Sequence, residues 1–145
     1  MLPLETLLSI PQIDSEYPFD ISPDGQWVAY AANYSGRWEL YELRLGDERA
    51  EPRRLQPGAG GSFNPRYSPG GERLAWAMDT TGGESFHLMV LEREAGRLTD
   101  LTPEIPFSLQ PNFCWSPDGK SCAILADRDG CFAAYTIPSN GDPLT

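Results

Sequence analysis

The sequence has few basic residues, and no long apolar run. Its 145 residues include 11 Lys and Arg against 21 Asp and Glu, which gives a formal net charge of −10. That balance argues against a nucleic-acid backbone or an anionic membrane surface as the partner, because both attract clustered Lys and Arg. No apolar stretch approaches the roughly 18 residues of a membrane-spanning helix. We therefore expect neither nucleic acid nor membrane as a partner.

Cysteine is also scarce. The three cysteines all lie within 114–131, and an odd number so confined does not make the disulfide framework of a small secreted protein. The opening stretch "MLPLETLLSIPQ" lacks a basic region and carries Glu5 among its apolar residues, so no signal peptide is expected. These features predict a cytoplasmic protein.

What the sequence does contain is a threefold repeat. It reads "ISPDGQWVAYA" at 21–31, "YSPGGERLAWA" at 67–77 and "WSPDGKSCAIL" at 115–125. Ser-Pro-Asp-Gly favours a type I turn, because Pro presets φ, Ser and Asp bond to local backbone, and Gly accepts a positive φ. In the second copy Gly70 replaces Asp, which predicts the same geometry with one local hydrogen bond lost.

Each turn is flanked by segments typical of strands. The residues after the turn form a continuous apolar run, which indicates a strand buried on both faces. Its middle position is always alanine (Ala29, Ala75, Ala123), which predicts close packing against a neighbouring sheet. Further strands are expected before the turn (19–21, 65–67, 113–115), after a polar loop (38–45, 86–92, 132–137), and ending near Leu55, Leu101 and Leu144.

Four short strands in every 46 to 48 residues predict an all-β fold made of β-propeller blades. A helical solenoid is excluded, because Pro and Gly interrupt every window of helical periodicity. We expect three four-stranded antiparallel blades of one incomplete propeller domain: a lead-in segment at 1–17, then blades at 18–57, 58–104 and 105–145. Propellers close with four to eight blades. The chain is therefore expected to be part of a longer protein, with two uncovered apolar faces that make it self-associate in isolation.

The repeats resemble those of TolB-like propellers and of the N-terminal propeller of prolyl oligopeptidase-family serine peptidases, acylaminoacyl-peptidase-like members in particular. The resemblance is carried by "SPDGQWVAYAANYSGRWELYELRL" and "FCWSPDGKSCAILADRDG" and covers about residues 18–145. The opening "LPLETLLSIPQIDSEYPFDISPDG" is similar to the segment that leads into the first blade of those peptidases. The resemblance implies that catalysis belongs to a C-terminal α/β-hydrolase domain.

No catalytic, cofactor-binding or metal-binding residue is predicted in this chain. A serine hydrolase needs a Gly-x-Ser-x-Gly elbow, and "GAGGSFNP" at 58–65 lacks the second glycine. His87, the one histidine, is expected to be solvated on a strand, without partners for a triad or a metal site. "DRDG" at 127–130 begins like a calcium loop but has Pro138 at the twelfth position, where an EF-hand needs glutamate, so we interpret it as a turn.

Two further sets of residues carry open alternatives. Cys122 aligns with Val28 and is expected in the core, yet Cys114 and Cys122 could face each other across the hairpin as a redox pair. The position shared by Asp20, Arg66 and Cys114 is expected to line the central channel of the propeller, where solvation is favoured over contact with a ligand.

Two functions fit these residues. In the first, the chain is the non-catalytic propeller portion of a prolyl oligopeptidase-like serine peptidase, which gates and orients peptide substrates for an absent hydrolase domain. The apolar residues of its lead-in segment could then dock on that domain: Leu2, Leu4, Leu7, Leu8 and Ile10. In the alternative, it is part of a stand-alone TolB-like propeller that serves as a binding scaffold. The expected partners are the hydrolase domain or the remaining blades, and a peptide substrate.

Overall fold

The computed structural model describes residues 10–55, 60–103, 108–128 and 130–142. These residues contain eleven strands: β1 Phe19–Ile21, β2 Trp27–Ala32, β3 Glu39–Arg44, β4 Arg53–Arg54, β5 Gly61–Tyr67, β6 Arg73–Asp79, β7 Phe86–Glu92, β8 Arg97–Asp100, β9 Ser108–Trp115, β10 Ser121–Asp127 and β11 Phe132–Pro138. In this part of the chain there is no helix with the length and apolarity needed to cross a membrane.

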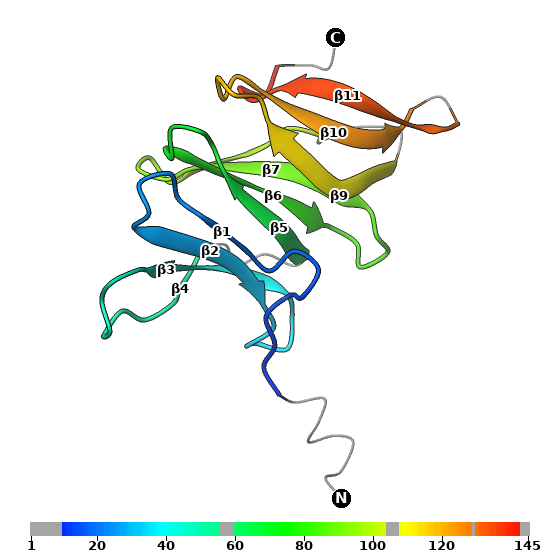
Figure 1. The fold of residues 1–145 in the computed structure, drawn as a ribbon. Coiled ribbons are helices and arrows are strands. Elements are labelled where there is room, and N and C mark those ends of the chain that lie inside the picture. Colours follow the sequence, from blue (N-terminus) through cyan, green and yellow to red (C-terminus); the bar gives the residue numbers. More distant parts are fainter. Residues whose placement is uncertain (1–9, 56–59, 104–107, 129, 143–145) are drawn as a thin grey trace, which may run out of the picture.

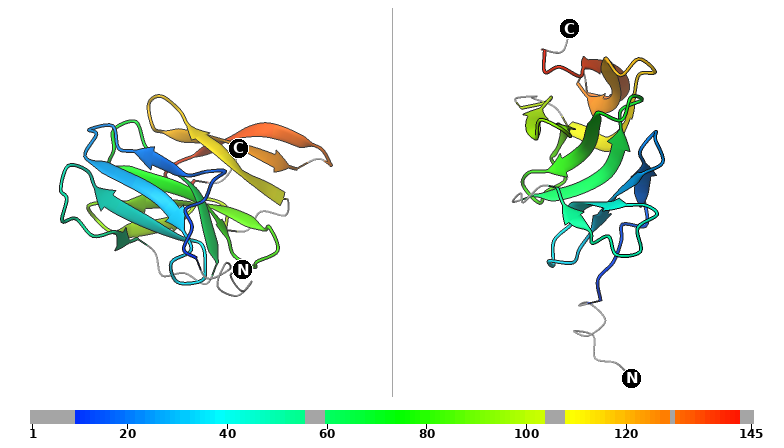
Figure 2. Two further views of the ribbon diagram at one scale, coloured as in Figure 1. Left: turned by 60° about the horizontal axis from the view of Figure 1, so that its bottom comes forward. Right: turned by 90° about the vertical axis from the view of Figure 1, so that its left-hand side faces the viewer.

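The strands form three separate antiparallel sheets, which lie side by side in chain order (Figures 1 and 2). Blade 1 has the order β1-β2-β3-β4, blade 2 the order β5-β6-β7-β8, and blade 3 the order β9-β10-β11. The predicted all-β fold of successive propeller blades is confirmed. The fourth strand expected near Leu144, and the predicted blade boundaries at 57–58 and 104–105, lie outside the described residues.

Each blade contains the expected turn between its first two strands. In blade 1 the N–H of Gly25 donates to the carbonyl of Ser22 at 2.8 Å, and Gly25 has a φ of +70°. The Ser22 hydroxyl donates to the Asp24 carboxylate, and this bond lowers the pKa of Asp24. The same backbone bond closes the other two turns, from Gly71 to Ser68 and from Gly119 to Ser116. The local sequence therefore fixes all three hairpins.

The turn of blade 2 has a glutamate close to the glycine that stands in place of aspartate. Hydrogen bonds from its own backbone and from the Ser68 hydroxyl lower the pKa of Glu72. A Cβ built on Gly70 would lie 2.1 Å from Oε2 of Glu72, so this carboxylate occupies the space of the absent side chain. The hydrogen bonds that Asp24 and Asp118 accept from serine in the other two turns have no counterpart from Gly70, as predicted.

Consecutive blades pack face to face through alternating side chains. Ala29, Ala31 and Leu40 of blade 1 are fully buried against a surface of blade 2 that includes Leu74 and Trp76. Blade 2 meets blade 3 through an equivalent set: Ala75, Leu88 and Val90 against Leu109, Cys122, Ile124 and Ile137. Ala29 and Ala75 are buried at the two seams, which confirms the predicted close approach there, whereas Ala123 of blade 3 is only half-buried.

The first strands of the blades, β1, β5 and β9, are neighbours and exchange polar contacts. The Asp20 carboxylate accepts the N–H of Tyr67 at 2.8 Å. One blade further on, the indole N–H of Trp115 donates to the carbonyl of Arg66 at 3.0 Å, and Nδ2 of Asn64 donates to the carbonyl of Pro111 at 2.7 Å. Each contact joins a side chain to the main chain of an adjacent blade.

A buried ion cluster also joins blades 1 and 2. The Glu42 side chain is 1% exposed. Its Oε1 lies 2.7 Å from Nη2 of Arg93 and 2.8 Å from the Tyr67 hydroxyl, and its Oε2 lies 2.7 Å from Nη2 of Arg53. The Arg93 guanidinium is stacked over the rings of Trp27 and Tyr67, 5.6 and 5.1 Å from their centroids. Carboxylate, guanidinium and aromatic planes thus form one unit across the seam.

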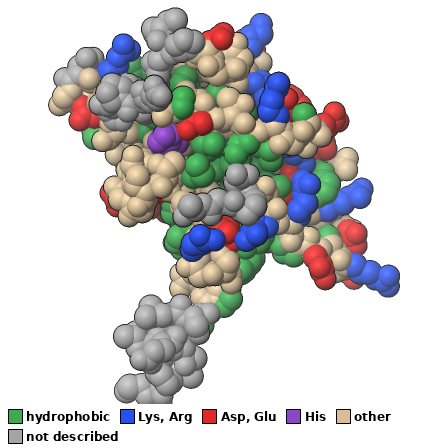
Figure 3. Space-filling model, turned by 180° about the vertical axis from the view of Figure 1, so that it is seen from behind, with side chains coloured by type: hydrophobic (Ala, Val, Ile, Leu, Met, Phe, Trp, Pro, Cys, Tyr) green, Lys and Arg blue, Asp and Glu red, His purple; other side chains and the backbone are tan. Residues whose placement is uncertain are grey.

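The outer faces of the first and third blades expose large apolar side chains. On blade 1 Phe19 and Ile21 are 51% and 48% exposed. On blade 3 Leu125 and Phe132 are 40% and 54% exposed. Seen from behind, hydrophobic side chains gather in the middle of the molecule (Figure 3). Two uncovered blade faces were predicted, and the described residues have them.

Candidate functional site

The segment of the sequence nearest to a hydrolase motif has a structural role. Ser62, the serine of "GAGGSFNP", lies in β5 and is 4% exposed. Its N–H donates to the carbonyl of Trp38 at 3.0 Å, which ties β5 to blade 1. A side chain buried in a blade seam cannot serve as an exposed nucleophile.

His87 is paired, which corrects the expectation of a solvated histidine. Its Nδ1 lies 2.7 Å from Oδ2 of Asp100, and both side chains are largely buried, with exposures of 21% and 26%. The other carboxylate oxygen of Asp100 accepts the N–H of Thr102, whose hydroxyl accepts the N–H of Leu88. These bonds hold β8 and the following residues against β7, so the pair has a structural role.

The two cysteines flanking the third turn do not face each other. Cys114 is opposite Ala123 and Cys122 is opposite Trp115, so their side chains lie on opposite faces of blade 3. Cys122 is fully buried, and burial raises the pKa of its thiol to about 12, whereas Cys114 is exposed. Core packing of Cys122 is confirmed, and the alternative of a redox pair is wrong.

The remaining sequence candidates are also placed by the structure. Of the proposed channel residues, Asp20 is half-buried on the Tyr67 backbone, Nη1 of Arg66 lies 3.4 Å from the Phe19 carbonyl, and Cys114 is exposed. The first two therefore link blades in addition to any contact with solvent. Within 127–130, Asp127 ends β10, and the described part of the chain holds no cluster of three acidic, His or Cys side chains suited to a metal ion.

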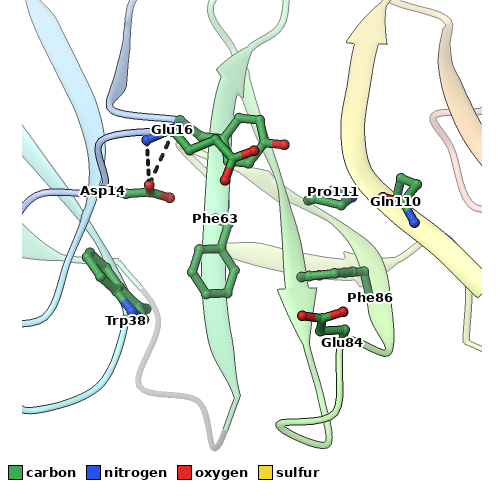
Figure 4. Close-up of a pocket in the computed structure, with 9 residues that line it drawn as sticks. Asp14, Glu16, Trp38, Phe63, Glu84, Phe86, Gln110 and Pro111 are labelled. Atoms are coloured by element: carbon green, nitrogen blue, oxygen red, sulfur yellow. Dashed lines mark hydrogen bonds between the residues drawn. The ribbon is translucent and has the colours of Figure 1, made fainter.

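The site that the structure adds is a pocket of about 390 Å³ at one end of the inner strands, named here the strand-end pocket (Figure 4). It draws residues from the lead-in segment and from all three blades. They are Asp14, Glu16, Tyr17, Trp38, Phe63, Glu84, Phe86, Gln110 and Pro111. Concave sites with apolar walls and a few polar groups are typical of ligand binding.

Three aromatic rings form the wall of the strand-end pocket. The centroid of Phe63 lies 6.1 Å from that of Trp38, at an interplanar angle of 45°, and 6.1 Å from that of Phe86, at 82°. Trp38 directly precedes β3, Phe63 lies in β5 and Phe86 begins β7. The row therefore crosses the seam between blades 1 and 2.

Three carboxylates accompany this wall, and the nine lining residues include no Lys, Arg or His. Asp14 accepts the backbone N–H groups of Glu16 and Tyr17 through Oδ1, which fixes the turn that carries Glu16 (Figure 4). Burial, followed by the neighbouring Glu16 carboxylate, raises the pKa of Tyr17. The potential of the pocket is thus negative.

Glu84 reaches the pocket from a loop held by one aspartate. The Asp79 carboxylate accepts backbone N–H groups from Thr81, Gly82 and Glu84 at 3.1, 2.9 and 3.1 Å. Burial opposes ionisation of Asp79, but these bonds outweigh it and lower its pKa. Glu84 itself has a φ of +60°, a conformation that glutamate rarely adopts. The loop maintains this strained residue at the pocket, and such strain is concentrated at functional sites.

A second residue with a positive φ lies next to Phe63 of the aromatic wall. Asn64, next to Phe63, has a φ of +54° and lies at the irregularity of the β5–β6 pairing. Its Nδ2 bonds to the carbonyl of Pro111, and its buried Oδ1 has no hydrogen-bond partner among the described residues. This contact positions Phe63 and Pro111 relative to each other.

Sequence reasoning missed this pocket. One signal was present, because an aromatic residue stands at the start of the third strand in every repeat: Trp38, Phe86 and Phe132. The first two line the pocket, while Phe132 is exposed on blade 3. The carboxylates carried no such signal, since Glu16 and Glu84 lie in non-repeated segments.

Comparison with solved structures places the fold in a class. The described residues are blades of a β-propeller of the kind found in TolB and in prolyl oligopeptidase-type peptidases. TolB from Acinetobacter baumannii matches with a TM-score of 0.64 and 21% identity, over 90% of this chain and 31% of that one. A puromycin-hydrolyzing peptidase from Mycobacterium tuberculosis matches with a TM-score of 0.72 and 21% identity, over 93% and 23%.

Sequence comparison gives more particular relatives. The chain is 29% identical over 123 residues to dipeptidyl-peptidase 5 from Porphyromonas gingivalis, which is 77% of this chain and 18% of that protein. It is 30% identical over 111 residues to the uncharacterized peptidase YuxL from Bacillus subtilis, which is 71% and 16%. No protein-family model matches. The resemblance to peptidase and TolB-like propellers is confirmed, and the chain spans only about a fifth of the length of these curated relatives.

Proposed function

We propose that this chain is the non-catalytic propeller portion of a prolyl oligopeptidase-like serine peptidase, where it gates and orients peptide substrates for a hydrolase domain. The observation that carries the proposal is the identity of 29–30% with proteins named as peptidases, over more than two thirds of this chain. The strand-end pocket supports it, because it offers a peptide an apolar wall together with polar groups from the lead-in segment and from blades 2 and 3.

The solved structures are consistent with a peptide partner. One of them, prolyl oligopeptidase B from Galerina marginata, is bound to a 25mer macrocyclization substrate, and this chain matches it with a TM-score of 0.62 over 91% of its residues. At 16% identity that likeness concerns the fold alone. Orientation of a substrate needs contact groups in fixed positions. The backbone hydrogen bonds accepted by Asp79 and Asp14 fix the two loops that carry the pocket's glutamates.

The test uses the gene that encodes this chain, expressed together with all of its downstream coding sequence. A Gly-x-Ser-x-Gly segment followed by Asp and His, with labelling by a fluorophosphonate, is the expected result. In that protein Trp38→Ala should raise the KM for a tripeptide substrate several-fold, while hydrolysis of a small acyl ester, which needs no orientation by the propeller, stays unchanged. Absence of the hydrolase motif would refute the proposal, as would equal effects on both substrates.

A second candidate is a stand-alone TolB-like binding propeller. It is favoured by one relative, the uncharacterized protein Atu1656 from Agrobacterium fabrum, which is 26% identical and of which this chain covers 38%. That larger share means a shorter relative than the peptidases above. Further blades followed directly by a stop codon would decide for this alternative.

A further inference from the structure

We infer that the strand-end pocket binds the cationic side chain of an arginine in a peptide. The inference rests on the proposed peptide-binding role and names the chemistry that the pocket selects. Its basis is the combination of an aromatic wall with carboxylates that lack a cation of their own.

The carboxylates are placed to receive such a group. Glu16 and Glu84 lie on either side of the row formed by Trp38, Phe63 and Phe86 in Figure 4. No salt bridge joins either glutamate to another described residue, and neither side chain is buried. Both therefore remain available to a charge that enters from solvent, and the net charge of −10 attracts cations toward the molecule.

The aromatic wall selects among cations. A guanidinium is planar, weakly hydrated and stacks on aromatic faces, whereas an ammonium is compact and strongly hydrated. The wall also suits the methylene stem of a long side chain, which a peptide's α-ammonium group does not have. A cavity of about 390 Å³ leaves room for that stem as well as for the charged head.

The same chain already contains this recognition chemistry in a satisfied form. At the seam between blades 1 and 2, the Arg93 guanidinium stacks over Trp27 and Tyr67 and bonds to the Glu42 carboxylate. The strand-end pocket presents the equivalent groups, aromatic rings and carboxylates, with the arginine missing. A ligand would supply to the pocket the guanidinium that Arg93 supplies within the fold.

Isothermal titration of the full 145-residue chain with three blocked or unblocked tripeptides tests the inference. The probes are Ac-Ala-Arg-Ala-NH2, the same peptide with neutral citrulline in place of arginine, and unblocked Ala-Ala-Ala. The arginine peptide should bind at least about tenfold more tightly than either of the others, because only it brings a planar head group that is also positively charged to the wall. Its affinity should fall as salt is raised.

Variants localise the effect. Glu84→Gln and Glu16→Gln should each weaken binding of the arginine peptide about three- to tenfold and leave the citrulline peptide unchanged. Glu94→Gln is the matched control, because it removes the same charge from an exposed residue of the β7–β8 turn, and it should change affinity less than twofold. Circular dichroism confirms that each variant keeps its strands.

The outcomes separate this inference from the proposed function. Equal affinity for the arginine and citrulline peptides would overturn the inference, as would equal effects of Glu84→Gln and Glu94→Gln, or tightest binding by Ala-Ala-Ala. None of these results touches the peptidase assignment, which depends on the downstream hydrolase motif. Conversely, an arginine preference in a protein that lacks the motif would support the inferred arginine binding and refute the peptidase proposal.

Discussion

Arg93 of blade 2 holds its Nη2 2.7 Å from Oε1 of Glu42 in blade 1, and the carboxylate is almost fully buried. The pair is therefore a contact between blades that water does not screen. Removal of Arg93 would leave the buried Glu42 carboxylate with only the exposed Arg53 and the Tyr67 hydroxyl as partners, and an incompletely compensated buried charge is costly.

Arg93→Met should accordingly lower the free energy of unfolding by about 3 kcal/mol. The control is Arg97→Met, which breaks an exposed contact with Glu92 and should cost less than about 1 kcal/mol. Urea unfolding of both variants at one protein concentration makes the comparison. Similar losses for the two would show that the buried cluster has no special weight.

Asp79 should give stability a specific dependence on pH. The pKa of this carboxyl is lowered from 3.8 in the folded protein, so its contribution is complete above pH 3.8 and is lost as pH falls through the folded value. Asp79→Asn should therefore destabilise the chain by about 1–2 kcal/mol at pH 7. The gap between variant and parent should shrink in acid, as thermal melts at pH 7 and pH 3 would show. A constant gap would contradict this account.

The thiols should differ in reactivity. Cys114 and Cys131 are exposed, while Cys122 is buried with its pKa raised to about 12. We expect two fast-reacting groups with Ellman's reagent at pH 8 and a third that reacts only on unfolding.

A raised pKa also means that Cys122 stabilises the fold below pH 9.0, and that this contribution is lost as pH rises toward 12. Cys122→Ala should leave the number of fast groups at two.

The two open blade faces should make the 145-residue chain self-associate. Phe19, Ile21, Leu125 and Phe132 occupy positions of the kind that neighbouring blades cover within the molecule. Light scattering should show dimers or larger species at micromolar concentration, and Leu125→Lys should shift them toward monomer. Leu45→Lys, at an exposed turn residue, is the control and should change nothing. A monomeric parent chain would refute this expectation.

Local chemistry explains what could be predicted from the sequence. The Ser-Pro-Asp-Gly turns and the apolar runs after them depend on residues a few positions apart, and so hairpins, blade type and the buried alanine were accessible. Contacts between distant residues were not. Cys114 and Cys122 flank the same turn, and only the strand register shows that their side chains lie on opposite faces of the blade.

The strand-end pocket could not be predicted from the sequence for the same reason. Glu16, Glu84 and Gln110 come from the lead-in segment and from two blades, and their proximity depends on how sheets stack. The buried ion cluster could not be predicted either. In the sequence Glu42 resembles any polar strand residue, and its partners Arg53 and Arg93 are brought to it only by the fold. The position of the Glu72 carboxylate beside Gly70 depends on a side-chain conformation that the local sequence does not specify.

The links between β1, β5 and β9 have a consequence for how such molecules diverge and grow. Asp20 bonds to a backbone N–H, which every amino acid except proline provides, and Asn64 and Trp115 bond to backbone carbonyls, which all of them provide. Only one partner in each link is thus tied to a particular residue type, and mutation is free to alter the other. Gene duplication can therefore append a unit without evolving new side-chain partners for these particular links.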